Sequence, residues 1–347
     1  MRSVVTVAIL LCLLSAFAMG CKPAATEAAA QSPEPAAAPA QPPAPEPAAV
    51  VPEPAAPEPA PAPAVEQTPA APPAPAPEPE PAPVAKAPLP EWTYDRFLEL
   101  AAATGRNMKV SKETFDKVQL RKPDALKRIE DYLVQRLGKA DPVVVAAFKE
   151  VPREYFHYNY EGKTSIVGSC YEAEAKPWGV GYGSALSDYL GQAYMTQLAQ
   201  PDADDVALEI GTGSGFQISL LSRICKEVYS IEIIEPLGNA VGGVIQTLGY
   251  DNVHTKVGDG YFGWPEVEGG FDVIMVTCAA LHVPPALLDQ LKPGGRLIIP
   301  VGPPMRGKQV LYVYTKDEEG KIHSKRDLGI YFIPMKGQML KDKKAKG

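Results

Sequence analysis

Cysteine is scarce in this sequence. The 347 residues include five cysteines, and Cys12 and Cys21 lie within the first 21 positions. The folded part is therefore left with Cys170, Cys225 and Cys278, an odd number with no C-x-x-C spacing. The odd number and the lack of this spacing exclude a disulfide framework as the basis of the fold.

An excess of basic residues is also absent. The chain carries 34 Lys and Arg against 41 Asp and Glu, a net charge of −7. Residues 1–90 hold three basic and eight acidic side chains, which leaves 31 basic and 33 acidic ones for residues 91–347. This nearly neutral remainder lacks the basic surface with which nucleic-acid binders displace counterions, so we expect no nucleic-acid partner. The lysines near the C-terminus predict only a solvated basic tail over 336–347.

The N-terminal apolar run is too short for an ordinary membrane span. It covers about 15 residues, from Val4 to Ala18, where a span needs roughly 20. One basic residue, an apolar stretch and small residues before a break are typical of a secretory signal. Ala18-Met19-Gly20-Cys21 also resembles the lipobox of bacterial lipoproteins, in which the cysteine is lipidated. We therefore predict a signal peptide over 1–21, lipidation at Cys21 and a periplasm-facing location in the bacterial cell envelope. A plain cleaved signal, an uncleaved anchor and a cytoplasmic location remain open.

Residues 22–90 are built almost wholly from Pro, Ala and Glu. They contain 24 of the 38 prolines. Such a segment has too little apolar surface to offset its ordering entropy, so we expect a disordered linker. Repeated Pro-Ala and Glu-Pro units favour extended polyproline II, at about 3.1 Å per residue, which would suit a stalk that lifts a domain off a membrane or an inert spacer. The remaining 257 residues suffice for one large domain with a helical prefix over 91–131.

The remainder predicts an α/β domain. Apolar residues at three- and four-residue spacing indicate early helices, and short apolar strands then alternate with helices near 215–224, 236–248 and 285–291. The early helices are expected over 94–103, 123–137, 142–149 and 189–198, and the strands over 206–210, 228–233, 253–257, 271–277, 296–301, 310–314 and 329–333. Residues 155–183 show no clear period and predict irregular structure. The alternation favours a doubly wound, mostly parallel, Rossmann-like sheet with its ligand at the carboxyl ends of the strands.

The first strand of this alternation leads into a glycine-rich turn that opens a helix. The G-x-G-x-G spacing of Gly211, Gly213 and Gly215 differs from the G-x-G-x-x-G of dinucleotide sites. Acidic Glu209, at the end of the strand, would repel a pyrophosphate and attract a cationic aminoacyl sulfonium. The predicted cofactor-binding residues are Glu209, Gly211, Thr212, Gly213, Ser214, Gly215, Glu232, Asp259 and Gly260.

Two further acids complete the predicted cofactor site. Glu232 ends the second strand and could accept hydrogen bonds from both ribose hydroxyls. Asp259 follows the third strand and could accept from an adenine amino group. Together these residues indicate S-adenosylmethionine, although Asp259 could instead cap the next turn and Glu232 could be a solvated strand end.

Several motifs in this region resemble those of the protein-L-isoaspartate O-methyltransferase family. The resemblance spans about 200 residues, over 132–335. Its motifs are LEIGTGSG (208–215), VYSIEIIEPL (228–237), GDGYFGWP (258–265), FDVIMVTCAA (271–280), LLDQLKPGGRLIIPVG (287–302), FIPM (332–335) and, upstream, DPVVVAAFKEVPREYF (141–156). It implies a class I S-adenosylmethionine-dependent methyltransferase that modifies the α-carboxylate of L-isoaspartyl residues in damaged proteins and thereby repairs them. We expect a monomer with isoaspartyl proteins or peptides as partners.

One segment departs from the family's pattern. The family carries Q-T-I-S-x-P before the first strand, and its serine is the assigned catalytic residue, which here corresponds to Ser187. The threonine is replaced by Ala185, which removes a hydroxyl, and Asp188 introduces a charge. A negative charge beside a carboxylate pocket would cost on the order of 1–4 kcal/mol, depending on exposure.

The implied chemistry needs few groups. An α-carboxylate is ionised at neutral pH, so it needs no general base, and we expect no metal. Alignment of the reacting atoms and exclusion of water are the main requirements. If the acceptor were a neutral hydroxyl or amine, a base would help, and Asp188 or His282 could serve. Two alternatives therefore remain, namely a methyltransferase of the same fold with another acceptor and a non-catalytic binding module of the cell envelope.

Overall fold

The computed structural model describes residues 86, 89–305 and 307–345. The predicted leader, the candidate lipidation site Cys21 and the linker up to residue 85 lie outside the described residues. Within the described part of the chain, no helix is long and apolar enough to cross a bilayer.

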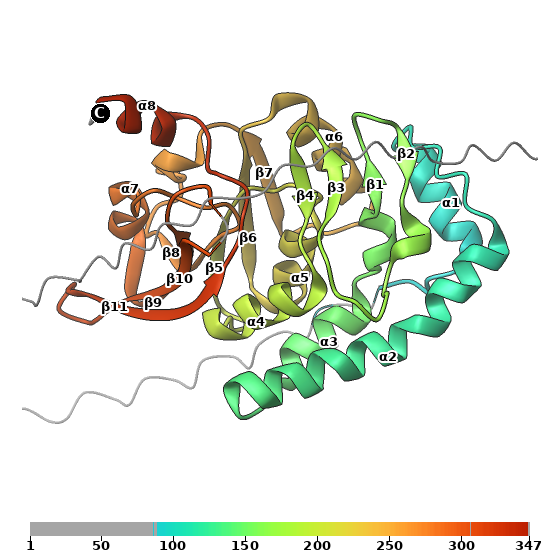
Figure 1. Cartoon of the computed structure of the whole chain (residues 1–347), viewed down its shortest axis with the longest axis horizontal. Helices are drawn as coiled ribbons and strands as arrows, with labels where there is room; N and C mark the ends of the chain where they lie inside the picture. Colours follow the sequence, from blue (N-terminus) through green and yellow to red (C-terminus); the bar gives the residue numbers. More distant parts are fainter. Residues whose placement is uncertain (1–85, 87–88, 306, 346–347) are drawn as a thin grey trace, which may run out of the picture. The chain divides into compact units, whose positions relative to one another are not determined.

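The elements alternate from residue 206 onward as the sequence predicts (Figure 1). The α-helices are α1 (Tyr94–Ala103), α2 (Lys112–Leu137), α3 (Pro142–Glu150), α4 (Tyr189–Ala199), α5 (Phe216–Ile224), α6 (Glu235–Thr247), α7 (Pro285–Asp289) and α8 (Gln338–Ala345). The strands are β1 (Tyr158–Asn159), β2 (Thr164–Ser165), β3 (Trp178–Gly181), β4 (Ser184–Leu186), β5 (Val206–Ile210), β6 (Glu227–Glu232), β7 (Val253–Val257), β8 (Phe271–Val276), β9 (Leu291–Val301), β10 (Gln309–Lys316) and β11 (Ile322–Ile330).

Seven strands form one sheet in the order β11-β10-β9-β8-β5-β6-β7. The strands from β9 to β7 are mutually parallel, whereas β10 pairs antiparallel with both β9 and β11. The chain runs outward from β5 through β6 to β7 and then returns to place β8 on the other side of β5. This reversal opens a crevice at the carboxyl ends of β5 and β8, which is where doubly wound sheets bind ligands. The predicted fold class is confirmed.

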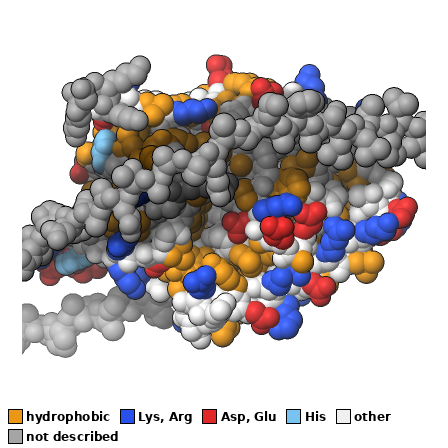
Figure 2. Space-filling view, viewed as in Figure 1, with side chains coloured by type: hydrophobic (Ala, Val, Ile, Leu, Met, Phe, Trp, Pro, Cys, Tyr) orange, Lys and Arg blue, Asp and Glu red, His pale blue; other side chains and the backbone are white. Residues whose placement is uncertain are grey.

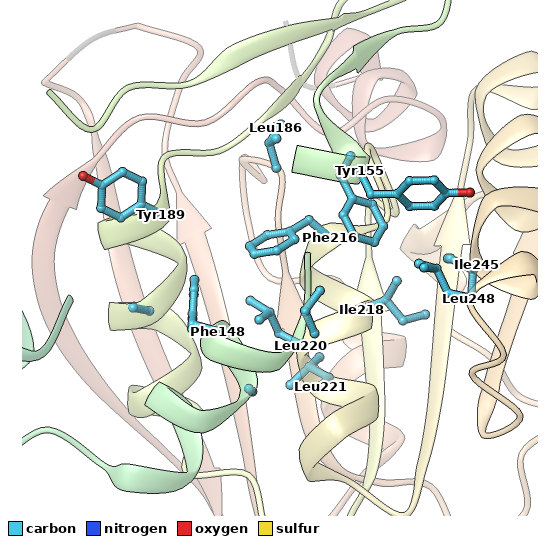
Figure 3. Close-up of a cluster of buried hydrophobic side chains, with 14 of the residues drawn as sticks. Phe148, Tyr155, Leu186, Tyr189, Phe216, Ile218, Leu220, Leu221, Ile245 and Leu248 are labelled. Carbon is cyan, nitrogen blue, oxygen red and sulfur yellow. The ribbon is translucent and has the colours of Figure 1, made fainter. Parts of the chain in front are cut away.

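Successive side chains along the strands point in turn into two layers of buried apolar residues, a larger layer and a smaller one. Val273 and Met275 of β8 face the larger layer, while Ile274 and Val276 face the smaller one. In Figure 1, α2 and α3 lie outside α4 and α5 on the side of the larger layer. Figure 3 shows Phe216, the first residue of α5, at the centre of this layer with Phe148 and Leu186 around it. Residue 216 thus anchors the helix that begins directly after the glycine-rich turn.

The predicted helical prefix is part of the same core. Its predicted end at residue 131 falls inside α2, and Phe97 and Phe115 are buried in the larger layer. Helix α2 begins at Lys112 rather than at the predicted residue 123, because Ser111 caps it by accepting the N–H of Thr114 at 3.1 Å. The proline at 123 is tolerated in the helix interior at an exposed position.

Surface ion pairs cover the outer face of α2. Lys112 and Asp116 pair at four-residue spacing, as do Glu113 and Lys117. Figure 2 accordingly shows acidic and basic side chains intermixed over this helix. Exposed pairs of this kind contribute little to stability.

A buried carboxylate joins the prefix to the rest of the domain. Glu154, in the 3₁₀-turn Arg153–Phe156, is 0% exposed. Its Oε1 accepts the indole N–H of Trp92 at 2.6 Å and the amide of Gln119 at 2.5 Å, and its Oε2 accepts the hydroxyl of Tyr171 at 3.0 Å. The carboxylate therefore satisfies three donors from separate segments.

Four further predictions differ from the observed elements. Residues 155–183, expected to be irregular, contain the β1–β2 pair and strand β3. The last strand, β11, ends at Ile330, whereas the sequence predicted 329–333. Residues 292–295, expected as a turn before the fifth strand, belong to β9. The expected basic tail forms α8, whose Met339 is 0% exposed in the smaller layer, because its first turn carries an apolar side chain that the sheet can bury.

The Glu154 cluster predicts a stability effect. Glu154→Ala would leave three donors without an acceptor, namely the buried hydroxyl of Tyr171 and the partly buried groups of Trp92 and Gln119, and an unsatisfied buried donor costs about 1–3 kcal/mol. We expect the free energy of unfolding, measured by urea denaturation, to fall by about 3 kcal/mol or more. Glu130→Ala is the matched control, since Glu130 lies exposed on α2, and such surface changes stay within about 0.5 kcal/mol. Equal stability of the two variants would contradict the assigned role.

Candidate functional site

A pocket opens at the carboxyl ends of β5, β6 and β8, where the strand order reverses. The end of β5 and the turn that follows line what we call its floor, and residues of β4 and α4 and residues 331–336 line what we call its walls. Of the predicted site residues, the structure brings these into the lining: Ser187, Glu209, Gly211, Thr212, Gly213, Ser214, Glu232, Asp259 and Gly260.

The turn after β5 is held by backbone conformation and by one acid. Gly211 has φ +104°, and a Cβ there would lie 2.9 Å from the hydroxyl oxygen of Thr277. That hydroxyl donates to the carbonyl of Gly211 at 2.7 Å, which ties the end of β8 to the turn. Glu232 accepts the N–H of Gly213 at 2.8 Å and the N–H of Ile234 at 3.0 Å. The turn is therefore fastened from both neighbouring strands.

Glu232 keeps acceptor capacity for a ligand. A carboxylate offers about four lone-pair sites, and two are used by backbone N–H groups. Its side chain is 5% exposed and lines the pocket, so it is not the solvated strand end that the sequence left open. The remaining sites can accept hydroxyl groups of a bound nucleoside.

Glu209 is a second buried acid on the floor. It is 1% exposed, and its Oε2 accepts the hydroxyl of Ser230 at 2.9 Å; the Ser230 oxygen lies 2.7 Å from that of Thr212. Burial raises the pKa of the Glu209 carboxyl well above its usual range, the Ser230 hydroxyl opposes that rise, and the charge of Glu232 adds to it. A cation in the pocket would reverse this shift, because it favours the ionised carboxylate.

Asp259 is fixed by two backbone donors. Its Oδ1 accepts the N–H of Tyr261 at 3.0 Å, and its Oδ2 accepts the N–H of Gln338 at the start of α8 at 2.7 Å. Asp259 therefore does cap the next turn, the alternative that the sequence left open, and it lines the pocket as well. Helix α8 thus helps to position the acid expected to contact adenine.

The wall beside the floor carries the altered family segment. Ser184, Ala185 and Ser187 line the pocket, followed by Gln192 and Met195 on α4. The carbonyl of Ser187 accepts the Nη2 of buried Arg153 at 2.6 Å. The predicted catalytic serine is therefore fixed through its own backbone.

Three residues singled out in the sequence lie outside the lining. Asp188 is the N-cap of α4 and accepts the N–H of Gly191 at 2.7 Å, which gives it a structural role. His282 lies against Tyr261 and Asp342, so neither it nor Asp188 is placed as a general base. Gly215 does not line the pocket either. A Cβ there would lie 2.7 Å from Val241, so this glycine allows α5 to pack against α6.

The sequence interpretation missed several lining residues. Gln217 lines the pocket just after the glycine-rich turn. Its Nε2 donates to the hydroxyl of Thr196 at 2.9 Å. The side-chain Oε1 of Gln217 has no hydrogen-bond partner among the described residues. Gln192 lies on the same wall as Ser187. The one signal in the sequence for Gln192 as a pocket residue was its position on a predicted helix, five residues after the serine. The 331–336 segment was expected in part as a strand and instead forms a wall.

The residues present fit S-adenosylmethionine. Two buried acids on the floor, Glu209 and Glu232, suit a cationic amino acid and a ribose, and Asp259 offers an acceptor beyond them. The apolar side chains of Ile233, Phe332 and other lining residues suit a purine ring. Among the described residues, no group of three or more His, Cys, Asp or Glu is placed to hold a metal ion.

Known proteins match this chain in sequence and structure. The sequence model of the family described as protein-L-isoaspartate(D-aspartate) O-methyltransferase matches residues 127–340. Protein-L-isoaspartate O-methyltransferase 1 of Nitrosospira multiformis is 46% identical over 194 residues, which are 56% of this chain and 78% of that protein. Protein-L-isoaspartate O-methyltransferase 2 of Syntrophobacter fumaroxidans is 43% identical over 205 residues, 58% of this chain and 79% of that protein. A solved protein-L-isoaspartate O-methyltransferase superposes with a TM-score of 0.55 at 26% identity, covering 65% of this chain and 69% of its own.

The raised pKa of Glu209 predicts opposite effects of Glu209→Gln on stability and on ligand binding. In the folded protein Glu209 holds its proton above the pH at which an unfolded glutamate loses it, so stability falls as pH rises through that interval. Glutamine does not ionise, so the Glu209→Gln variant avoids this loss of stability. We expect the variant to have a higher Tm than wild type at neutral pH in the absence of ligand. Each 1 kcal/mol moves Tm by about 2–4 °C at this size.

The same variant should bind S-adenosylmethionine more weakly, because it lacks the charge that faces the cation. Cation binding lowers the pKa of Glu209 and releases a proton, so wild-type affinity should rise with pH from the acid side. Calorimetry in buffers of different ionisation enthalpy measures this release. An equal proton release in Glu209→Gln would show that the carboxylate does not face the cation.

Proposed function

Because the chain belongs to the protein-L-isoaspartate(D-aspartate) O-methyltransferase family, we propose that it methylates the α-carboxylate of L-isoaspartyl residues in damaged proteins, with S-adenosylmethionine as methyl donor. The sequence resemblance implies the same reaction. Methylation turns the α-carboxylate into an ester with a better leaving group. The backbone nitrogen of the following residue attacks this ester and releases methanol, which closes a succinimide that hydrolyses partly to normal aspartate.

The observation that carries this proposal is the convergence of Ser187 with the acidic floor in one pocket. Ser187 lies on the β4–α4 wall, whereas Glu209 and Glu232 end neighbouring parallel strands. The floor suits a cationic donor, and the serine lines the same cavity. A carboxylate acceptor placed at the serine would then meet the donor within a single cavity.

The chain's own residues mainly orient and enclose the reactants. Bound S-adenosylmethionine supplies a methyl group on a positively charged sulfur. The acceptor carboxylate is already ionised at neutral pH, so no side chain has to remove a proton. Ser187 would orient the acceptor, and Glu232, which holds the glycine-rich turn, would also accept the ribose hydroxyls. The wall formed by residues 331–336 would reduce access of water. Alignment of the reactants can supply several kcal/mol of the rate acceleration.

A direct assay tests the proposed activity. The purified chain is incubated with methyl-labelled S-adenosylmethionine and an isoaspartyl peptide, or with the identical peptide containing aspartate. We expect label in the isoaspartyl peptide alone. Ser187→Ala should lower kcat/KM about tenfold or more by removing a hydrogen bond to a charged group. Ser324→Ala, on the exposed side of β11, serves as the control. Equal labelling of both peptides, or none, would overturn the proposal.

We further propose that a lipid on Cys21 anchors the enzyme to the bacterial cell envelope, with residues 22–90 as the spacer. The support is the lipobox-like sequence Ala18–Cys21 and the run of proline directly after it. Expressing the full chain in bacteria fed labelled palmitate should give a labelled protein in the membrane fraction. Cys21→Ala should abolish the label. Label that persists in Cys21→Ala would contradict lipidation at this position.

A further inference from the structure

The amide of Gln192 is oriented by a buried charge. Gln192 lies on α4, is 7% exposed and lines the pocket five positions after Ser187. The Nη1 of Arg153 donates to its Oε1 at 2.6 Å. A guanidinium has donors and no acceptor, so only the amide oxygen can face it. The amide nitrogen is consequently turned away from Arg153.

That nitrogen is left for a ligand. Among the residues that the structure describes, Nε2 of Gln192 has no hydrogen-bond partner, yet it is not one of the fully buried unpartnered atoms. Because the side chain lines the pocket and its oxygen is taken, the accessible nitrogen faces the cavity. It presents two N–H donors there.

Arg153 adds a positive field to the same wall. It is 2% exposed, and its two terminal nitrogens donate to neutral oxygens, those of Gln192 and of the Ser187 backbone. It packs over the ring of Phe216 at 4.8 Å. In the described part of the chain it makes no direct ion pair with an acidic side chain, although the charge of Asp188 acts on it from a greater distance. A buried cation without a contacting anion favours an anion in the adjoining cavity.

We propose that Gln192 binds a carboxylate of the reacting ligands through Nε2, and that Arg153 is the positioning residue that fixes this orientation. The proposal deepens the methyltransferase function proposed above and rests on it. Gln192 would supply a donor on the wall where Ala185 lacks the threonine hydroxyl of the family's segment. Two ligands bring a carboxylate: the isoaspartyl acceptor and the methionyl part of S-adenosylmethionine.

The chemistry of the reaction predicts where the effect is seen. If the carboxylate is the acceptor's, its negative charge diminishes as the oxygen takes up the methyl group. A hydrogen bond donated to that carboxylate is therefore at least as strong before the reaction as in the transition state. Removing such a donor raises KM and leaves kcat nearly unchanged. A merely structural defect would not divide the two constants in this way.

Gln192→Leu tests the binding role, with Gln197→Leu as the matched control. Gln197 lies on the same helix with the same 7% exposure, but its amide bonds to Asp141 and Lys139 outside the pocket lining. Affinities are measured calorimetrically with the full chain: S-adenosylmethionine alone, and an isoaspartyl peptide added to protein saturated with S-adenosylhomocysteine. A hydrogen bond to a charged group predicts a rise in one Kd of about tenfold to a hundredfold in Gln192→Leu. Gln197→Leu should lower Tm and leave both Kd values unchanged.

The two measurements separate the two sources of the carboxylate. A weaker peptide with unchanged S-adenosylmethionine assigns Gln192 to the acceptor, and the reverse assigns it to the methyl donor. Unchanged affinity for both ligands in Gln192→Leu overturns the proposal. These affinities do not depend on turnover. A wild-type protein that fails to methylate the peptide would refute the proposed function. The measured affinities would still show whether Gln192 binds a carboxylate.

A double-mutant cycle tests the positioning role of Arg153. Arg153→Lys keeps the charge but cannot direct two parallel donors at Gln192 and Ser187. We expect it to weaken the same ligand that Gln192→Leu weakens, and to have a smaller effect in the Gln192→Leu background. Additive effects would overturn the positioning role. If Arg153→Lys fails to fold, Gln192→Glu is used instead. It should weaken carboxylate binding more than Gln192→Leu through repulsion, and equal or tighter binding would contradict the proposal.

Discussion

The carboxylate of Glu232 holds the turn after β5 in the shape that the pocket requires. It accepts one N–H from the turn and one from its own strand end, so it links two neighbouring parallel strands at their carboxyl ends. Burial strengthens these charge-assisted bonds, since little water competes for the oxygens. Without this link the glycines of the turn would be free to adopt other conformations, and the floor of the pocket would lose its defined shape.

The remaining parts of the site are attached to this floor from separate regions of the chain. Arg153, in the turn before β1, fixes the backbone of Ser187, and α8 fixes Asp259 from the C-terminal end. Glu154, next to Arg153, carries the prefix helices into the same core. The segment around residues 153 and 154 therefore fastens both the predicted catalytic wall and the N-terminal helices. This arrangement explains why the prefix is part of the domain.

The sequence predicts the floor well, because local rules govern it. A short apolar strand, a glycine-rich turn and an acid at the end of the next strand are all visible within about 25 positions. Gln192 shows the limit of such rules. Its orientation depends on Arg153, 39 positions earlier, and no local pattern reveals which atom of an amide faces a cavity. Asp188 shows the converse, since an added charge that suggested a changed pocket turns out to cap a helix. The end of β11 was misplaced because an edge strand with mostly exposed side chains lacks the apolar run used to locate it.

Two buried acids on one floor are costly in an unliganded protein and useful when a cation binds. Desolvation and mutual repulsion raise the pKa of Glu209, and a positively charged methyl donor relieves both. The most direct test of this account is a crystal structure of the chain with S-adenosylhomocysteine. The account predicts ribose hydroxyls on Glu232, the aminoacyl group near Glu209 and the adenine beside Asp259. A ligand bound elsewhere, or a Glu232 carboxylate turned away from it, would contradict the account.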